Sequence, residues 1–250
     1  MARLVLLGTG AALPNAQHEN TYMLLDGPHA AILNDCAGNP IGRLEHAGVA
    51  LDRLESVIIT HIHPDHTYGL PSLLMGMWLA GRTRPLHIYA LGSVAKRLQA
   101  ILENFEWGEW PGFYAVTFHA IDDAPGAHVI DNADFRIDAW RTKHMVPTIG
   151  LRIENKTNGY VTAYSCDTEP CANVLELAQG ADLLIHEAAG ATPGHSSAAQ
   201  AGEAGRVSGA RKLALIHYLV PADLQALARE AQSTFGAPVD VTQDFDEYSV

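Results

Sequence analysis

The chain has 250 residues, of which 48% are apolar and 18% charged, and this composition and size favour one globular α/β domain over residues 1–250. Its formal net charge of −12 argues against general attraction to nucleic-acid backbones, although a bound metal ion brings positive charge of its own. No apolar stretch approaches the roughly 18 residues of a membrane span, and three cysteines without CxxC spacing suggest free thiols in a reducing cytoplasm.

The first half of the chain reads as strands followed by strand–helix alternation. Residues 26–28, Asp-Gly-Pro, indicate a hairpin between two of the strands, and Gly48 marks the end of a short helix. Apolar and β-branched runs predict strands over 3–7, 21–25, 31–34, 54–60 and 86–90, and helices over 40–48, 70–80 and 93–104.

The second half repeats this layout. Strands are predicted over 133–141, 149–154, 160–165, 181–187 and 212–217, and helices over 170–179, 197–208 and 222–235. Two such halves imply two sheets packed face to face with helices on the outside. The predicted fold class is therefore α/β, as a four-layer αββα sandwich.

Two segments leave alternatives open. The predicted helix 70–80 is apolar nearly all round, which indicates burial either in the core or against a second subunit. Residues 105–114 are rich in aromatics, glycine and proline, and their rings either pin the loop to the core or stack on a base or an aryl leaving group. Glu106 and Glu109 disfavour a role in tracking phosphates.

A dense cluster of metal-type side chains follows the strand 54–60. His61 and His63 are two apart in extended chain and point the same way, whereas Pro64 ends the strand and leaves Asp65 and His66 on the turn. Imidazole nitrogen and carboxylate oxygen suit zinc and related ions. Four donors arranged as two pairs indicate the beginnings of two neighbouring metal positions.

The pattern His61-x-His63-x-Asp65-His66 resembles the signature of the metallo-β-lactamase superfamily of metallohydrolases. Residues 6–14 (LLGTGAALP), 34–38 (NDCAG) and 68–74 (YGLPSLL) are similar to the ribonuclease Z-like branch, which processes tRNA 3′ ends. The resemblance extends from about residue 3 to about residue 220. It implies the metallo-β-lactamase fold, which agrees with the αββα sandwich.

The resemblance also implies a ligand set. On it, one metal takes His61, His63 and His144, the other takes Asp65, His66 and His217, and Asp167 bridges them. Seven donors exceed one tetrahedral zinc, so the count also indicates two divalent ions, zinc or alternatively manganese or iron. Asp35 either orders the loop around the metals, as the resemblance implies, or serves as a turn residue.

A further pair bears on the leaving group. By resemblance, His195 donates a proton to the departing oxygen and Glu187 orients it, while Asp65 both ligates metal and steers the nucleophile. The alternative for His195 is a loop residue before a helix capped by Ser196.

Two metals that share a water favour hydrolysis. The tRNA-processing members carry a long arm between the third histidine motif and the bridging aspartate, and no arm fits between His144 and Asp167. We therefore expect a small phosphodiester, a cyclic nucleotide or a nucleotide or aryl diester, as substrate. A tRNA 3′ endonuclease, lactonase, thioesterase or arylsulfatase are alternatives, and His63 argues against a redox diiron protein. The resemblance also implies a homodimer.

Overall fold

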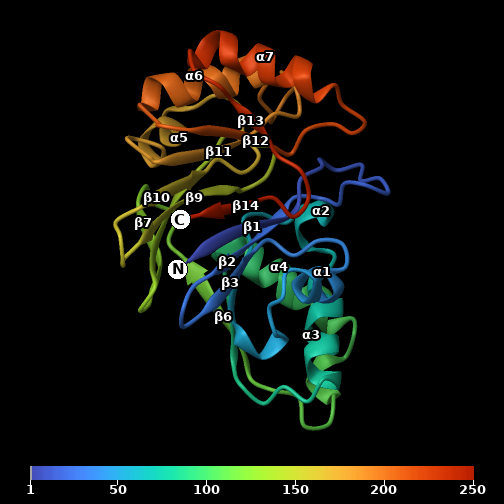
Figure 1. Cartoon of the computed structure of the whole chain (residues 1–250). Helices are drawn as coiled ribbons and strands as arrows, with labels where there is room; N and C mark the ends of the chain where they lie inside the picture. The colour runs from blue at the N-terminus through green and yellow to red at the C-terminus, as the bar shows by residue number, and fades with distance from the viewer. Residues whose placement is uncertain (1) are drawn as a thin grey trace.

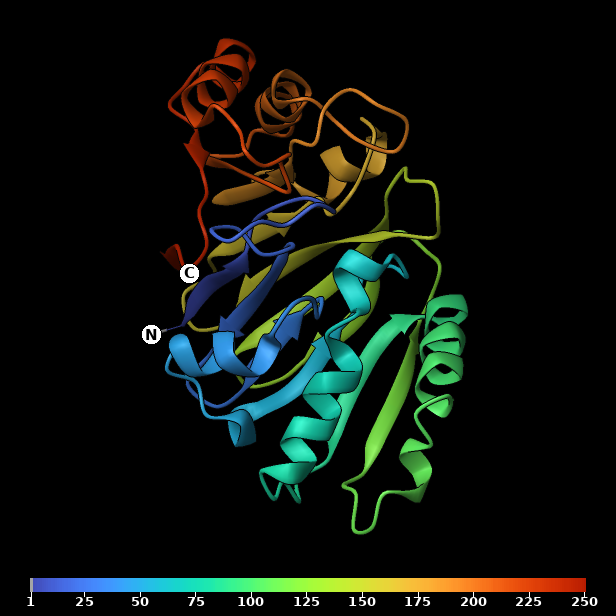
Figure 2. The ribbon, with the colours of Figure 1, turned by 90° about the vertical axis from the view of Figure 1, so that its right-hand side faces the viewer.

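The computed structural model describes residues 2–250 and has four layers (Figures 1 and 2). Two seven-stranded sheets pack face to face, and helices cover the outer face of each sheet. The predicted αββα sandwich is therefore confirmed. Among the described residues, no helix combines the length and apolar character needed to cross a membrane.

The first sheet has the order β14-β1-β2-β3-β4-β5-β6. Strands β3 to β6 run parallel, whereas β14, β1 and β2 add antiparallel pairs at one side. The strands are β1 (Arg3–Gly8), β2 (Tyr22–Asp26), β3 (Ala31–Asn34), β4 (Leu54–Ile58), β5 (Leu86–Leu91), β6 (Val116–Ile121) and β14 (Glu247–Ser249).

The second sheet has the order β13-β12-β11-β10-β9-β8-β7. Strands β10 to β13 run parallel, and β7 to β10 form antiparallel pairs. The strands are β7 (Ala127–Asp131), β8 (Phe135–Arg141), β9 (Ile149–Asn155), β10 (Val161–Tyr164), β11 (Leu183–Glu187), β12 (Leu213–Ile216) and β13 (Asp240–Val241).

Helices follow the parallel strands and shield them from water. Along the first sheet lie α1 (Pro40–His46), α2 (Pro64–Thr67), α3 (Leu70–Leu79) and α4 (Gly92–Glu103), with single 3₁₀ turns at Leu51–Arg53 and Trp107–Glu109. Along the second lie α5 (Ala172–Leu177), α6 (Ala198–Ser208) and α7 (Leu224–Phe235). Because both faces of the central strands are covered, β2, β3, β11 and β12 are buried along their whole length, as expected for parallel and mixed sheets between helices.

The position of helix α3 decides only in part between burial in the core and burial against a second subunit. Its inner face, with Leu73, Leu74 and Met77, lies in the core, but Met75 is 43% exposed and Leu79 is 69% exposed. Core burial alone therefore does not account for the apolar character of this helix.

The aromatic loop 105–114 is pinned by its own rings. Trp110 stacks on Trp78 with ring centroids 5.3 Å apart, and Trp107 meets Phe113 edge to face at 5.7 Å. Trp78 lies near the end of α3, whereas the histidine cluster precedes the start of that helix, so this loop lies away from the cluster of the same chain. The first of the two interpretations of the loop is the one that these contacts support.

Four strands were not predicted: β6, β7, β13 and β14. Strands β6 and β7 end their sheets and are partly exposed, so they lack the continuous apolar run of a central strand. Strands β13 and β14 are two and three residues long, and β14 exists because it pairs with β1 from the other end of the chain.

Candidate metal centre

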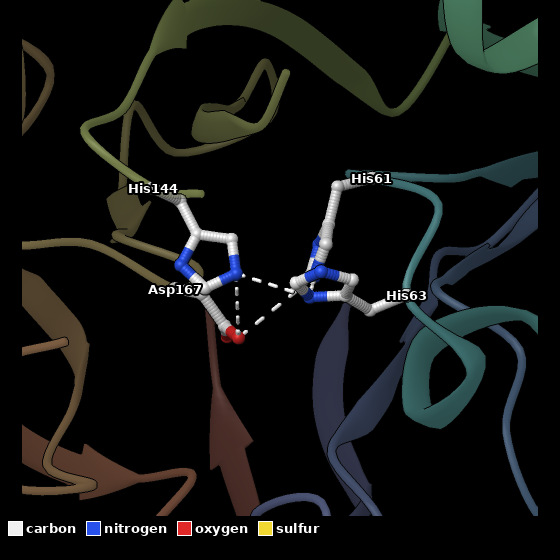
Figure 3. A group of neighbouring side chains, drawn as sticks. All are labelled: His61, His63, His144 and Asp167. Carbon is white, nitrogen blue, oxygen red and sulfur yellow. Dashed lines mark hydrogen bonds and ion pairs between the residues drawn. The ribbon is translucent and has the colours of Figure 1, made fainter. Parts of the chain in front are cut away.

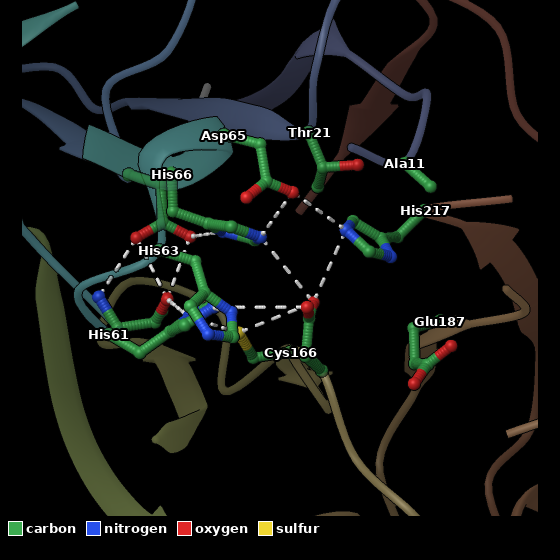
Figure 4. Close-up of polar contacts among 12 residues, drawn as sticks. Ala11, Thr21, His61, His63, Asp65, His66, Cys166, Glu187 and His217 are labelled. Atoms are coloured by element: carbon green, nitrogen blue, oxygen red, sulfur yellow. Dashed lines mark hydrogen bonds and ion pairs between the residues drawn. The ribbon is translucent and has the colours of Figure 1, made fainter. Parts of the chain in front are cut away.

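All seven predicted metal-type side chains meet at one edge of the sandwich, where strands of both sheets end (Figures 3 and 4). His61 and His63 follow β4, and Pro64 at the first position of α2 both stops the extended chain and starts the short helix that carries Asp65 and His66. From the facing sheet, His144 follows β8, Asp167 follows β10 and His217 follows β12.

The first group consists of His61, His63, His144 and Asp167 (Figure 3). His63 Nδ1 lies 3.1 Å from His61 Nε2 and 3.1 Å from His144 Nε2. Asp167 Oδ2 lies 3.8 Å from both of those Nε2 atoms. Three nitrogens and one oxygen therefore surround a common point.

The second group consists of Asp65, His66 and His217 (Figure 4). Asp65 Oδ2 lies 3.6 Å from His66 Nε2 and 3.5 Å from His217 Nε2. Asp167 Oδ1 lies 3.5 Å from each of the same two nitrogens. The two oxygens of Asp167 thus face different groups, which is the geometry of a carboxylate that bridges two sites.

The spacing within each group fits a tetrahedral metal ion. Nitrogen and oxygen ligands at ~2.0–2.1 Å from one zinc ion lie roughly 3.3 Å apart, close to the 3.1–3.8 Å separations found here. In addition, His66 Nε2 and His217 Nε2 are buried and have no hydrogen-bond partner among the described residues. Buried polar atoms without partners are costly, and a cation would satisfy them.

Neighbouring groups set the tautomers so that bare nitrogens face the centre. His66 Nδ1 donates to Asp35 at 2.9 Å, and His144 Nδ1 donates to the Gly194 carbonyl at 2.7 Å. The Thr60 hydroxyl gives its proton to Asp35 and therefore accepts the Nδ1–H of His61, 3.1 Å away. In each ring Nε2 is left with a lone pair, as metal coordination requires.

Asp35 connects residues of the centre through hydrogen bonds to its carboxylate. Its buried carboxylate accepts hydrogen bonds from the Thr60 backbone N–H at 2.8 Å, from the Thr60 hydroxyl and from His66. These contacts favour the interpretation of Asp35 as the residue that orders the loop, over that of a turn residue. Burial raises the pKa of Asp35, and its three donors oppose that rise.

Burial and the interactions between neighbouring groups set the pKa values of the side chains in the cluster. Burial places the pKa of His61 well below its ordinary value, which keeps the ring neutral. Burial would raise the pKa of Asp167, but its interactions with His217 and His66 outweigh burial and hold that pKa well below its ordinary value. The bridging carboxylate is therefore ionised.

The backbone at the centre is strained. Asp35, Cys166 and His217 all have left-handed backbone conformations, with φ of 61°, 51° and 51°. Such conformations cost non-glycine residues of order 1–3 kcal/mol each and persist where the surroundings over-determine them, commonly at functional sites. In all three cases, the left-handed residue lies just after the end of a strand, where it redirects the chain.

The predicted pair of Glu187 and His195 lies beside the two groups. His195 Nδ1 donates to Glu187 Oε1 at 3.0 Å, so its Nε2 is the nitrogen left for the centre. A ligand atom of His195 lies within 4.8 Å of those of Asp167 and His217. The hydrogen bond to Glu187 raises the pKa of His195 against the opposing effect of burial.

Glu187 is held by backbone donors that the sequence pattern did not reveal. Thr168 N and Ser196 N donate to Oε1 at 3.0 and 3.1 Å, and Ala189 N donates to Oε2 at 2.9 Å.

The predicted N-cap of helix α6, Ser196, was wrong by one residue. Ser197 is the cap, in a reciprocal box with Gln200, because Ser196 is engaged with Glu187 and with the Thr168 carbonyl.

Solved structures with this architecture identify the fold. The metallo-β-lactamase fold protein YhfI from Bacillus subtilis superposes with a TM-score of 0.82 at 22% identity, over 99% of this chain and 98% of its own. A diphosphatase from the PhnP family superposes with a TM-score of 0.79 at 16% identity, over 100% and 98%. The protein has the metallo-β-lactamase fold, with histidine and aspartate side chains placed to bind metal.

Sequence comparison narrows this class. Ribonuclease Z from Mycobacterium sp. (strain KMS) is 31% identical over 248 residues, which cover 88% of this chain and 85% of the relative. The family model described as Anti-Pycsar protein Apyc1 matches residues 2–233, and the chain belongs to that family. The resemblance to the metallo-β-lactamase superfamily and its ribonuclease Z-like branch is thereby confirmed, and the protein is a metal-dependent hydrolase.

Proposed function

We propose that this protein is a binuclear metal-dependent phosphodiesterase that hydrolyses a small phosphodiester, such as a cyclic nucleotide or a nucleotide or aryl diester. The observation that carries the proposal is the position of the His195–Glu187 pair beside two donor groups that share Asp167. Metal ions held by the two donor groups would offset the negative charge of a phosphodiester. An imidazole beside them can protonate an alkoxide or aryloxide leaving group.

In this proposal His61, His63 and His144 would hold one ion, Asp65, His66 and His217 would hold the other, and Asp167 would be shared by the two groups. Five imidazoles and two carboxylates favour zinc, with manganese or iron as alternatives. Bound ions of this kind generate a nucleophile from water at neutral pH and neutralise charge on the phosphate.

The protein's own residues then have distinct tasks. Asp65 lies at the mouth of the second group, partly exposed, where it can orient the attacking water. His195 holds a proton on the ring nitrogen that faces the centre, because Glu187 stabilises the protonated ring. Giving that proton to the departing oxygen avoids the release of a free alkoxide.

Charge near the centre supports a small substrate over RNA. Lys143, next to His144, pairs with Glu169 at 2.7 Å, and that carboxylate also accepts from Gly194 N. Between His144 and Asp167 the chain forms only β9, a tight turn and β10, so this stretch contains no arm to grip a tRNA. With a net charge of −12, long-range attraction to a polyanion is unfavourable.

Hydrolysis of pre-tRNA is the second candidate. The relative at 31% identity over most of this chain is named ribonuclease Z, and that name is the observation that favours it. Because no arm lies between His144 and Asp167, this chain would need a partner to hold the tRNA.

The test is a substrate panel on the zinc-loaded protein. We expect cleavage of cyclic nucleotides and of bis-p-nitrophenyl phosphate, and at most a trace of activity on pre-tRNA. The Asp167→Ala variant serves as the inactive control, and lactones, thioesters and sulfate esters complete the panel. Efficient cleavage of pre-tRNA with no cleavage of cyclic nucleotides would replace the proposal with the second candidate.

We also propose that the working form is a homodimer. Met75 and Leu79 of α3 and Ile101 of α4 are exposed, as are Tyr68 just before α3 and Phe105 just after α4, and exposed large apolar side chains in such number are typical of interaction surfaces. Leu79→Glu should shift the mass measured by light scattering toward the monomer, whereas Val207→Glu on the opposite helical layer should not. A wild-type monomer at micromolar concentration would contradict this part.

A further inference from the structure

A hollow lies between helices α5 and α6. Its volume is about 400 Å³, within the ~300–1,000 Å³ range of pockets that hold small organic molecules. The walls are mainly apolar, and none of the tasks proposed for the metal centre uses them. They include Cys171, Val174, Leu175, His186, Ala204 and Val207.

His186 is the polar group at the base of this pocket. Successive residues of a strand face opposite sides, so Glu187 points to the metal centre while His186 points into the helical layer. The His186 side chain is buried, and its Nδ1 lies 2.8 Å from the backbone oxygen of Glu187. Because a carbonyl only accepts, Nδ1 carries the proton.

The other ring nitrogen of His186 is therefore a bare acceptor. Among residues 2–250 no group hydrogen-bonds to Nε2, although the residue lines the pocket. Burial lowers the pKa of His186, so that the ring stays neutral. An acceptor that lines a pocket and has no partner within the protein favours a ligand that brings a donor.

The carboxylate, the amide oxygen and the thiol of the wall already have partners. Glu203 pairs with Arg206 at 2.5 Å, and the side-chain oxygen of Gln200 accepts from Ser197 N at 2.8 Å. The Cys171 thiol lies 3.7 Å from the Thr168 hydroxyl. With an ion-paired carboxylate at the rim and no free cation among these groups, the pocket selects against anions.

We propose that this pocket binds a small, uncharged, mainly apolar molecule that carries one hydrogen-bond donor, such as an aryl N–H or O–H, and that the donor engages His186 Nε2. The apolar walls supply most of the affinity, and the single acceptor supplies the selectivity, since an analogue without the donor leaves Nε2 unpaired.

The same two segments of the chain contribute residues to both the pocket and the metal centre. His186 and Glu187 are consecutive in β11, and the segment that carries Asp167 continues through Thr168, whose N–H donates to Glu187, to Cys171 in the pocket. We therefore expect an occupant to change the turnover of the centre, a part of the inference that rests on the proposed function.

Indole and 1-methylindole are matched probes, because they differ in the one donor. By calorimetry on the zinc-loaded protein, indole should bind about tenfold more tightly than 1-methylindole. In the wild-type protein, indole should also shift the ¹⁵N signal of His186 Nε2, which needs no variant. Equal affinities for the two probes, or an unmoved His186 signal, would overturn the inference.

Variants locate the site. His186→Leu should weaken indole to the level of 1-methylindole and leave 1-methylindole unchanged, with the zinc content as a check on folding. Val207→Trp, at an exposed position of the rim, should remove binding of both probes. The control Ile101→Trp places the same ring on α4 beside a smaller apolar groove of about 180 Å³.

The control also discriminates between the two hollows. Binding that survives Val207→Trp but is lost in Ile101→Trp would assign the probes to the groove on α4 and overturn the inference. Turnover of bis-p-nitrophenyl phosphate should change at saturating indole in the wild type and not in Val207→Trp. Unchanged wild-type turnover would overturn the coupling, while loss of all turnover without indole would instead contradict the proposed function.

Discussion

The assignment of His195 as the acid makes a quantitative prediction about leaving groups. A positioned general acid contributes roughly 10²–10⁴-fold to rate when the leaving group needs a proton. His195→Ala should therefore lower kcat/KM by about that factor for an alkyl diester. For bis-p-nitrophenyl phosphate, whose leaving group departs readily as an anion, the loss should be at most a few-fold.

Glu187→Gln supplies the second arm of the same experiment. The substitution replaces a charge-assisted hydrogen bond to His195, found at 3.0 Å, with a neutral one. Hydrogen bonds to charged groups contribute about 1.5–3 kcal/mol and neutral ones about 0.5–1.5 kcal/mol, so the loss of about 1–1.5 kcal/mol corresponds to roughly 5- to 15-fold in rate. The amide would also turn a donor toward Thr168 N or Ala189 N, so we expect a lower melting temperature as well.

The double variant tests whether the two residues act as one unit. If Glu187 works only through His195, then Glu187→Gln in the His195→Ala background should cost almost nothing further for alkyl diesters. His128→Ala, which removes a partly exposed imidazole at the β7 edge, is the matched control and should leave turnover unchanged. Equal losses for all leaving groups, or additive losses in the double variant, would refute the reasoning.

Three further predictions concern the metal centre and the fold. Elemental analysis of the purified protein should find close to two metal ions per chain, and Asp167→Ala should lower this number because both groups lose an oxygen. Asp65→Ala should abolish turnover but retain the wild-type far-ultraviolet circular dichroism; an active variant would remove Asp65 from the machinery. Burial opposes but does not outweigh the hydrogen bonds from His29 and Ala30 that hold the pKa of Asp134 below its ordinary value. That carboxylate therefore stabilises the fold above about pH 4 and loses its effect as pH falls through its folded pKa. In urea unfolding, the stability gap between wild type and Asp134→Asn should be widest near neutral pH and should shrink on acidification; a gap that is constant with pH would contradict this.

Local sequence determined the elements that are long, apolar and regular. The buried strands and the helices of both halves were predictable because periodicity and turn residues are encoded within a few neighbouring positions. The cluster at His61 to His66 was equally readable, since four donors fall within six residues after a buried strand. Helix α3 was located correctly, yet its composition did not reveal that Met75 and Leu79 face outward.

Tertiary structure decided everything that depends on partners distant in the chain. Strand β14 forms only against β1, and the edge strands β6 and β7 lack a local signal because half of each faces water. The same holds for the centre. Asp167 can serve two groups because its oxygens face opposite ways, and the ring nitrogens point inward because Asp35, Thr60 and the Gly194 carbonyl take the other nitrogens. A sequence states which donors exist, but their orientation is set by hydrogen bonds and sheet packing between segments that meet only in the folded chain.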